Sequence, residues 1–287
     1  MNITAQMVKE LRDKTGAGMM DAKKALVEVD GDMDKAAELL RQKGIASAEK
    51  KMGRIAAEGR VDSFVDANGG AMIEVNCETD FVAKNDEFKA LVAGLAENVQ
   101  LSNPADVEAL LASKCAKCDK VIEDALKEKI ASIGEKITVR RFVRYEGAVA
   151  SYVHNGKIGV LLNADNKDEE LLNDICLHIA SSAPKFVSRN EIPQEVIDEE
   201  TRIEMGKEDL QNKPEAIRGK IVEGRVNKLM AERCLLEQPF VKDPSVTVGQ
   251  LIEGKLTIKS FTRYELGEGL EKRQDNFAEE VMSQING

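Results

Sequence analysis

The chain has 287 residues, with 51 acidic and 41 basic side chains, a formal net charge of −10 and 43% apolar residues. This apolar content predicts a folded protein with a core and excludes disorder as its overall state. Non-specific nucleic-acid binding depends on clustered Lys and Arg, and base stacking depends on aromatic side chains. Because the chain is acidic and only 4% aromatic, with no Trp, it is not expected to bind nucleic acid directly.

Membrane and secreted classes are also disfavoured by the sequence. No apolar run approaches the ~20 residues of a membrane-spanning helix. The first residues reach Lys9, Glu10 and Arg12 without the apolar core of a signal peptide. Five cysteines form an odd and sparse set, which is typical of reduced thiols rather than of a disulfide framework. We therefore expect a soluble cytoplasmic protein without a membrane partner.

Residues 1–45 are expected to form a compact three-helix module, close to the lower size limit for independent folding. Thr4 is a candidate N-cap for the first helix, and Gly44 fits the position after the last one. The predicted helices cover 4–14, 19–29 and 34–43. A partly helical linker is predicted at 46–57. The stretch 41–60 holds six bases and two acids, so it is either a solvated tether or a contact to an acidic or phosphate-bearing surface.

An internal repeat begins at residue 58. Glu58-Gly59-Arg60-Val61 recurs 88 residues later at 146–149, and each copy opens a hairpin, the second with an Asn155-Gly156 turn. Each hairpin precedes a helix with apolar periodicity. A third strand within 133–146 is echoed 119 residues later at 252–265. This pattern predicts an α+β fold with a duplicated core of two three-stranded antiparallel sheets covered by helices.

The repeat sets the expected domain boundaries. The two core subdomains are 58–146 and 147–265, and a C-terminal helical module follows at 266–287. The longer spacing in the second copy places an insert at about 193–236. Within it, residues 191–209 carry a net charge of −6 and residues 213–233 a net charge of +3. Two helices of opposite charge are expected to pair as an antiparallel helical hairpin, which serves either as a partner-binding arm or as a homodimerisation arm.

Features of enzyme active sites are scarce in this chain. No strand is followed by a phosphate-cradling glycine loop. Cys115 and Cys118 lack a second Cys/His pair for zinc and fall on the apolar stripe of a predicted helix, so we interpret them as core thiols. His154 is expected on the surface and His178 near the end of a helix, neither beside a nucleophile. We therefore expect no enzymatic activity, no metal site and no cofactor.

The two copies differ after the hairpin. The first copy inserts a longer segment at 76–86, which carries Asp80 and Phe81 before an N-cap candidate at Asn85 or Asp86. Phe81 has two interpretations. It packs against the first turn of the following helix as a hydrophobic staple, or it is an exposed wedge for a groove on a partner.

Several long motifs resemble the family of bacterial elongation factor Ts. The first is Thr79-Asp-Phe-Val-Ala-Lys-Asn85, preceded by Glu74-Val-Asn-Cys-Glu. The second, within residues 15–26, matches the three-helix, ubiquitin-associated-like module of that family. Shorter matches lie at 238–241, 247–251 and 267–271. The resemblance therefore covers essentially the whole chain, in order.

The resemblance implies a guanine-nucleotide exchange factor for elongation factor Tu, which it binds in the GDP-bound and nucleotide-free states during translation elongation. It implies that residues 79–82 dislodge Mg²⁺ from this GTPase and that Phe81 enters its G domain. These four residues are Thr79, Asp80, Phe81 and Val82. The other implied contacts are Arg12, Met19, Met20, Lys23, His178 and Val241. The rival hypothesis is a protein-binding adaptor or holdase, which has no need of the loop with Asp80 and Phe81.

Overall fold

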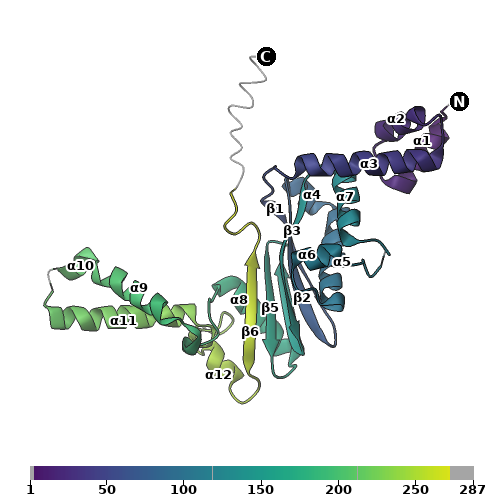
Figure 1. Ribbon diagram of the computed structural model, residues 1–287. Helices are drawn as coiled ribbons and strands as arrows, with labels where there is room; N and C mark the ends of the chain where they lie inside the picture. Colours follow the sequence, from purple (N-terminus) through teal and green to yellow (C-terminus); the bar gives the residue numbers. More distant parts are fainter. Residues whose placement is uncertain (1–2, 118, 212, 272–287) are drawn as a thin grey trace. The chain divides into compact units, whose positions relative to one another are not determined.

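The computed structural model describes residues 3–117, 119–211 and 213–271 (Figure 1). The chain divides into two compact units. The first comprises residues 1–62, 73–142 and the chain from 265 onward, and the second comprises 63–72 and 143–264. Most of the predicted C-terminal module at 266–287 lies outside the described residues. Within the described residues, no helix combines the length and the apolar character that crossing a bilayer requires.

The N-terminal helices form a small hydrophobic cluster of their own in the first unit. They are α1 (Ala5–Thr15), α2 (Met19–Glu28) and α3 (Met33–Lys51). Thr4 caps α1 as predicted, since its side chain accepts a hydrogen bond from the Met7 amide. The helix ends at Gly16, whose φ of 68° is a left-handed conformation that favours glycine. Their shared core consists of Val8, Leu11, Ala22, Ala25, Leu26 and Ala36.

The third helix continues past Gly44, so its predicted end at residue 43 is wrong. α3 packs against α7 (Ile122–Ile133). A Cβ atom on Gly44 would lie 2.9 Å from Cβ of Ala131, which is too close for a real contact. Gly44 therefore allows the two helices to approach closely, and it does not terminate α3. Lys51 adds a hydrogen bond from its Nζ to the Ile130 carbonyl oxygen at 3.4 Å.

The first three-stranded sheet has the order β1-β2-β3. Its strands are β1 (Glu58–Val65), β2 (Gly69–Cys77) and β3 (Ile137–Glu146). The helices between β2 and β3 are α4 (Asp80–Lys84), α5 (Asp86–Ser102), α6 (Val107–Ala112) and α7. Every residue of β2 is buried, and α5 contributes buried side chains such as Phe88 and Val92. The amphipathic helix predicted after the first hairpin is therefore confirmed.

A buried carboxylate ties β2 to β3 in the first unit. Glu74 is fully buried, and its oxygens accept from Arg140 at 3.0 Å, from Arg141 at 2.7 Å and from the Gly267 amide at 2.9 Å. Burial pushes the pKa of Glu74 upward, but the hydrogen bonds from Gly267 and the two arginines outweigh burial and lower it. Glu74 is therefore charged, and it fixes the chain after β6 to this unit.

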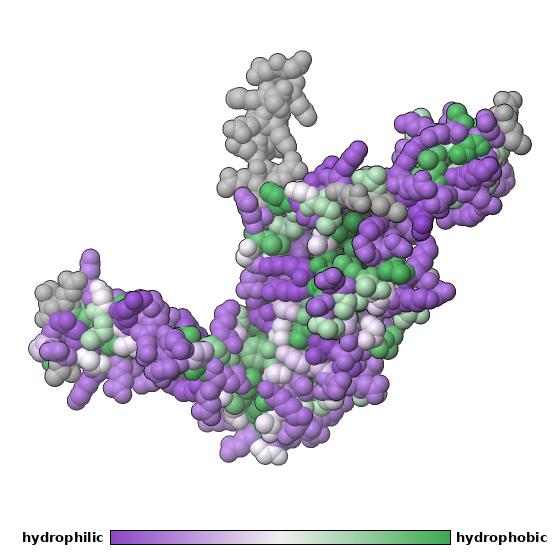
Figure 2. Space-filling view, viewed as in Figure 1, coloured by the Kyte–Doolittle hydropathy of each residue, from purple (hydrophilic) through white to green (hydrophobic). Residues whose placement is uncertain are grey.

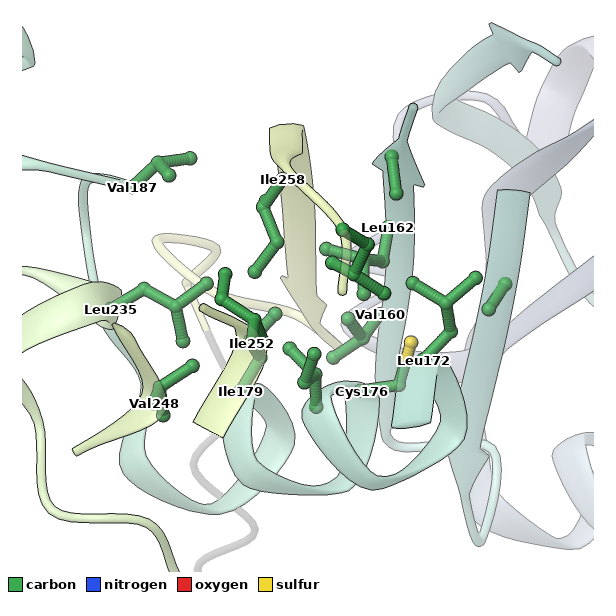
Figure 3. Packing of buried hydrophobic residues seen from close by; sticks show 14 of the residues in the cluster. Val160, Leu162, Leu172, Cys176, Ile179, Val187, Leu235, Val248, Ile252 and Ile258 are labelled. Carbon is green, nitrogen blue, oxygen red and sulfur yellow. The ribbon is translucent and has the colours of Figure 1, made fainter. Parts of the chain in front are cut away.

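The second sheet has the order β4-β5-β6, which confirms the predicted duplication of two three-stranded sheets. Its strands are β4 (Ala148–His154), β5 (Ile158–Ala164) and β6 (Ile258–Glu265). Asn155 and Gly156 have φ of 52° and 70°, as a tight hairpin turn requires, and they leave Ser151 opposite Leu161. α8 (Glu169–Ser182) packs against β4 and β5. Figure 3 shows apolar side chains such as Val160, Leu172 and Ile258 converging between the helix and the sheet.

The remaining helices of the second unit lie between α8 and β6. They are α9 (Gln194–Met205), α10 (Glu208–Gln211), α11 (Glu215–Arg233) and α12 (Val248–Ile252), with short 3₁₀ turns at Arg189–Glu191 and Leu235–Glu237. α9 packs against α11. Ion pairs between Glu204 and Arg225 and between Glu200 and Arg233 show that the two helices run in opposite directions. The acidic and basic segments therefore contact each other.

Candidate partner-binding site

The segment with Asp80 and Phe81 forms a helix of only five residues, α4. Thr79 caps it, because its hydroxyl oxygen accepts from the Val82 amide at 3.3 Å. Asn85 then caps α5 by accepting from the Glu87 amide at 2.7 Å. Of the two N-cap candidates in the sequence, the structure therefore selects Asn85. Asn85 thus ends α4 and starts α5, with no further residue between the two helices.

Phe81 is 81% exposed, the most exposed large apolar side chain among the described residues. None of the residues of α4 is buried. The alternative in which Phe81 staples the start of α5 is therefore wrong. A benzyl ring of this exposure on an ordered turn of helix is a feature of interaction surfaces rather than of a core.

Asp80 is oriented within α4. Its Oδ2 pairs with Lys84 Nζ at 2.6 Å, one helical turn further along. The side-chain hydrogen bond from Lys84 lowers the pKa of Asp80 below its ordinary value, so the carboxylate is charged at neutral pH. A charged carboxylate next to an exposed phenyl ring suits an approach to a cationic centre on another protein.

Two glutamates support the start of α4, of which Glu135 had no role in the predictions from the sequence and Glu78 appeared there only as part of a motif. Glu135 accepts hydrogen bonds from the Glu78 amide at 3.1 Å and the Thr79 amide at 3.0 Å through Oε2, and from the Thr79 hydroxyl at 2.6 Å through Oε1. Glu78 in turn accepts from the Lys136 amide at 2.6 Å. Glu135 stands 56 residues from Thr79 along the chain. No local pattern could have revealed this contact.

The N-terminal contacts implied by the resemblance gather on α2, apart from Arg12 on α1. Met19, Met20 and Lys23 are exposed on α2, and Figure 2 shows apolar residues on the surface at this end of the chain. Arg12 is half-buried and pairs with Asp13 at 2.9 Å. Val27, two turns after Met20, is also exposed, and sequence reasoning missed it. It shares the face of Met20 because residues seven apart on a helix lie on one side.

His178 requires a correction, because its side chain is fully buried and offers no exposed surface for a partner to contact. Its Nδ1 accepts from the Val241 amide at 3.2 Å, so Nε2 carries the proton and donates to Gln238 Oε1 at 2.8 Å. Val241 itself is exposed. Burial lowers the pKa of His178, and the hydrogen bond with Gln238 opposes this effect. His178 therefore supports the backbone of the segment that presents Val241.

The cysteines and the second histidine take no part in this site. His154 is exposed beside its turn, as predicted. Cys77 and Cys176 are buried, which raises the pKa of each thiol to about 12. Cys115 lies after the end of α6 at Ala112 and before α7, so the predicted continuous helix through this region is wrong. Cys118 lies outside the described residues.

A cleft of about 560 Å³ lies between α3 and α7 in the first unit. Its lining mixes bases such as Lys24 and Lys127 with acids such as Asp21 and Asp124, and it contains none of the residues predicted for the site. Across the described part of the chain, no cluster of three or more His, Cys, Asp or Glu side chains is arranged to hold a metal ion. The exposed apolar side chains among the predicted contacts are Phe81 on α4, Met19 and Met20 on α2, and Val241.

Comparison with known proteins shows the family of the chain. The model of the family described as elongation factor TS matches residues 78–268. The chain is 48% identical over 293 residues to elongation factor Ts of Alkalilimnicola ehrlichii and 49% identical over 294 residues to that of Thioalkalivibrio sulfidiphilus. Each alignment covers all of both chains. The chain belongs to the elongation factor Ts family.

Proposed function

We propose that this protein is a guanine-nucleotide exchange factor for elongation factor Tu, acting in the cytoplasm during translation elongation. In this proposal Phe81 enters the G domain and residues 79–82 dislodge Mg²⁺, after which GDP leaves. Membership of the elongation factor Ts family supports the partner. The observation that carries the proposal is the 81% exposure of Phe81 on a helix turn whose backbone is fixed at its N-terminus.

The physical argument rests on differential binding. A nucleotide and its metal favour one conformation of a GTPase, so a protein that binds better to the metal-poor conformation weakens nucleotide binding by the same factor. Burying a phenyl side chain stabilises a complex by about 2–3 kcal/mol. If that burial occurs only when the partner's helices have moved, the whole gain favours nucleotide release. Covalent chemistry is not needed.

α4 is suited to this task because little order has to be gained on binding. Thr79 caps the helix, and Asp80 is paired with Lys84, so the backbone and the carboxylate adopt defined positions in the free protein. An interface residue that is ordered beforehand loses less conformational entropy when it binds. In this proposal, the exposed face of α2 with Met20 and Lys23 docks on the same GTPase and contributes affinity.

The experiment is a stopped-flow measurement of fluorescent GDP release from elongation factor Tu at increasing concentrations of the factor. Phe81→Ala is expected to lower the maximal release rate roughly 30- to 160-fold, since about 2–3 kcal/mol of burial is lost. Its stability should change by less than about 0.5 kcal/mol, because the ring is exposed in the free protein. Equally fast GDP release with Phe81→Ala would contradict the wedge.

The matched control is Leu101→Ala. Leu101 is another exposed apolar residue, at the far end of α5, roughly 24 Å along the helix axis from Asn85. It should leave the release rate unchanged. A comparable loss in both variants would mean that exposed apolar area in general, rather than Phe81, governs the interaction.

A further inference from the structure

Apolar packing gives α4 limited support, since of its apolar side chains only Val82 and Ala83 are partly buried. None of its five residues is buried, and its largest side chain points to solvent. A helix of this length is far below the ~12 residues at which isolated helices become even marginally stable in water. Partial burial of two side chains is a small contribution, so polar contacts are needed to hold α4 in one position.

Polar contacts at its N-terminus supply that support. The carboxylate of Glu135, which lies between α7 and β3, accepts from both amides that lead into the helix, those of Glu78 and Thr79. Its second oxygen accepts the Thr79 hydroxyl proton at 2.6 Å. Because the hydroxyl proton points at Glu135, a lone pair of the same oxygen is free to accept from the Val82 amide. One carboxylate thus fixes the backbone before α4 and also the orientation of its cap.

A reciprocal contact closes the arrangement. Glu78 accepts from the Lys136 amide at 2.6 Å and pairs with Arg54 at 3.2 Å. The Lys136 ammonium donates to the carbonyl oxygens of Met52 at 2.6 Å and Arg54 at 3.0 Å. Three segments that are distant in sequence therefore meet behind α4. Hydrogen bonds to charged groups are about twice as strong as neutral ones, which makes this anchor a strong one.

We propose that Glu135 is a positioning residue for exchange, and that it holds α4 so that Phe81 is presented in its active orientation. This inference rests on the proposed function for its rate measurement. Without the carboxylate, two amides and a hydroxyl lose their acceptor, and α4 samples other orientations. The fraction of molecules ready to insert Phe81 then falls, and the exchange rate falls in proportion.

The test compares Glu135→Ala, Glu135→Asp and Glu135→Gln in the full chain, using GDP release from elongation factor Tu. Glu135→Ala is expected to lower the maximal rate about tenfold, as it would if roughly a tenth of the molecules kept α4 in place. The half-saturating concentration should change less than twofold, because the α2 face is untouched. Glu135→Asp should resemble the Ala variant, since its carboxylate is one methylene too short to reach Thr79.

Glu135→Gln is the conservative rescue. Its amide oxygen can accept from the two backbone amides, and its NH₂ group can donate to the Thr79 hydroxyl, so at least half of the maximal rate should remain. The matched control is Glu123→Ala, which removes another glutamate, on α7, that pairs with Lys127. It should leave exchange unchanged. Equal maximal rates for the wild type and Glu135→Ala, or an equal loss in the Ala and Gln variants, would overturn the proposal.

The double variant Glu135→Ala/Phe81→Ala separates this inference from the proposed function. If Glu135 acts through Phe81, the double variant is no slower than Phe81→Ala alone, whereas additive losses would overturn the positioning role. A normal rate of GDP release with Phe81→Ala would contradict the insertion of Phe81, but not the support of α4 by Glu135. That support is then tested by NMR-detected amide exchange, which should be faster at Glu78, Thr79 and Val82 in Glu135→Ala. Unchanged protection at these amides would contradict it.

Discussion

In each half of the duplicated core, side chains join the end of the hairpin to the segment before the third strand, but the two halves use different residues. In the second half, the chain leaves β5 and enters α8 within a few residues. There Asp165 accepts from the Thr257 amide at 2.7 Å and its own amide donates to the Thr257 carbonyl at 3.0 Å, which ties the hairpin to the start of the third strand. Asn166 adds a hydrogen bond from its side-chain amide to the Lys255 carbonyl oxygen at 3.4 Å, so Asp165 is the one carboxylate that the described residues place in this connection.

In the first half, the position equivalent to Asp165 is Cys77, 88 residues earlier. Its buried thiol donates to the Thr79 carbonyl oxygen at 3.2 Å, and the anchoring carboxylates are instead Glu78 and Glu135. In the second half, the position equivalent to Glu135 is Gly254, which has no side chain. The first half therefore uses two carboxylates where the second needs one. The additional anchoring supports α4, an element that the second half lacks.

The halves also differ at one buried position of the central strand. Glu74 of β2 corresponds to Leu162 of β5, and both side chains are fully buried. Leu162 packs in the apolar core of the second unit, whereas Glu74 binds two arginines and the Gly267 amide. One half is thus held by apolar packing at this point and the other by charge. This difference leads to predictions that range from large to small effects.

The largest effect is expected from Glu74→Leu, which places the residue of the second half into the first. It leaves two arginines and the Gly267 amide without their shared acceptor, so the free energy of unfolding should fall by about 3 kcal/mol. Urea unfolding measures this change. Leu162→Met is the control in the second half, and it should cost less than about 1.5 kcal/mol because it conserves volume. An unchanged urea midpoint for Glu74→Leu would show that the charge cluster contributes nothing.

The second prediction, of intermediate size, concerns the loss of folding stability at acidic pH. The pKa of His178 is lowered by burial, so the unfolded chain binds a proton that the folded chain does not as pH falls below about 6.5. Stability should therefore decrease with falling pH by up to about 1.4 kcal/mol per pH unit. The pKa of Glu74 is also lowered, but its contribution is fully present above about 4.5 and is lost only as pH falls below that value. The two halves should respond to acid in separate windows.

Urea unfolding at several pH values between 7.5 and 5 tests the first window. His178→Gln should flatten the slope in this range, whatever its effect on stability at neutral pH. The chain has only two histidines, and His154 is exposed, so His154→Gln is the matched control and should retain the slope. A slope that persists in His178→Gln would assign the acid response to other groups.

The sequence predicted correctly those features that depend on a few neighbouring residues. Thr4 and Asn85 cap helices, and Asn155-Gly156 forms the hairpin turn, because a side chain or a left-handed residue acts on its immediate neighbours. The repeat predicted both three-stranded sheets, since alternating and helical periodicities recur at fixed offsets. The part of the candidate site that lies on α4 was also predicted, through the resemblance of residues 79–85.

Predictions from the sequence were wrong or incomplete for residues whose role is set by a contact with a distant part of the chain. Gly44 resembles a helix terminus, but its role is close approach to Ala131, which is 87 positions away. His178 was expected at the interface, but its environment is set by Gln238 and Val241. Glu135 looks like any other surface acid until the fold brings it to Thr79. In each case the residue type fits several roles, and only tertiary structure selects among them.

The smallest effect is expected from Asp165→Ala, which removes the single carboxylate tie of the second half. Hydrogen bonds from Thr257 lower the pKa of Asp165, so this side chain is charged and stabilises the connection at neutral pH. The melting temperature should fall, by less than in Glu74→Leu, because Asp165 is exposed to water, which can replace it as an acceptor. GDP release from elongation factor Tu should be unchanged, because the segment after Asp165 contains no counterpart of α4 and Phe81.

Comparison of Asp165→Ala with Glu135→Ala distinguishes two roles of a carboxylate. Asp165 only joins two segments of the chain, whereas Glu135 is proposed also to position Phe81. Both substitutions remove a carboxylate that accepts from the backbone where the hairpin and the third strand of a half meet, although the two residues occupy different positions of the repeat. If only Glu135→Ala slows exchange, the additional carboxylate of the first half serves α4. If both variants slow exchange equally, with equal losses in melting temperature, the two anchors act only through general stability, and the difference between the halves has no functional meaning.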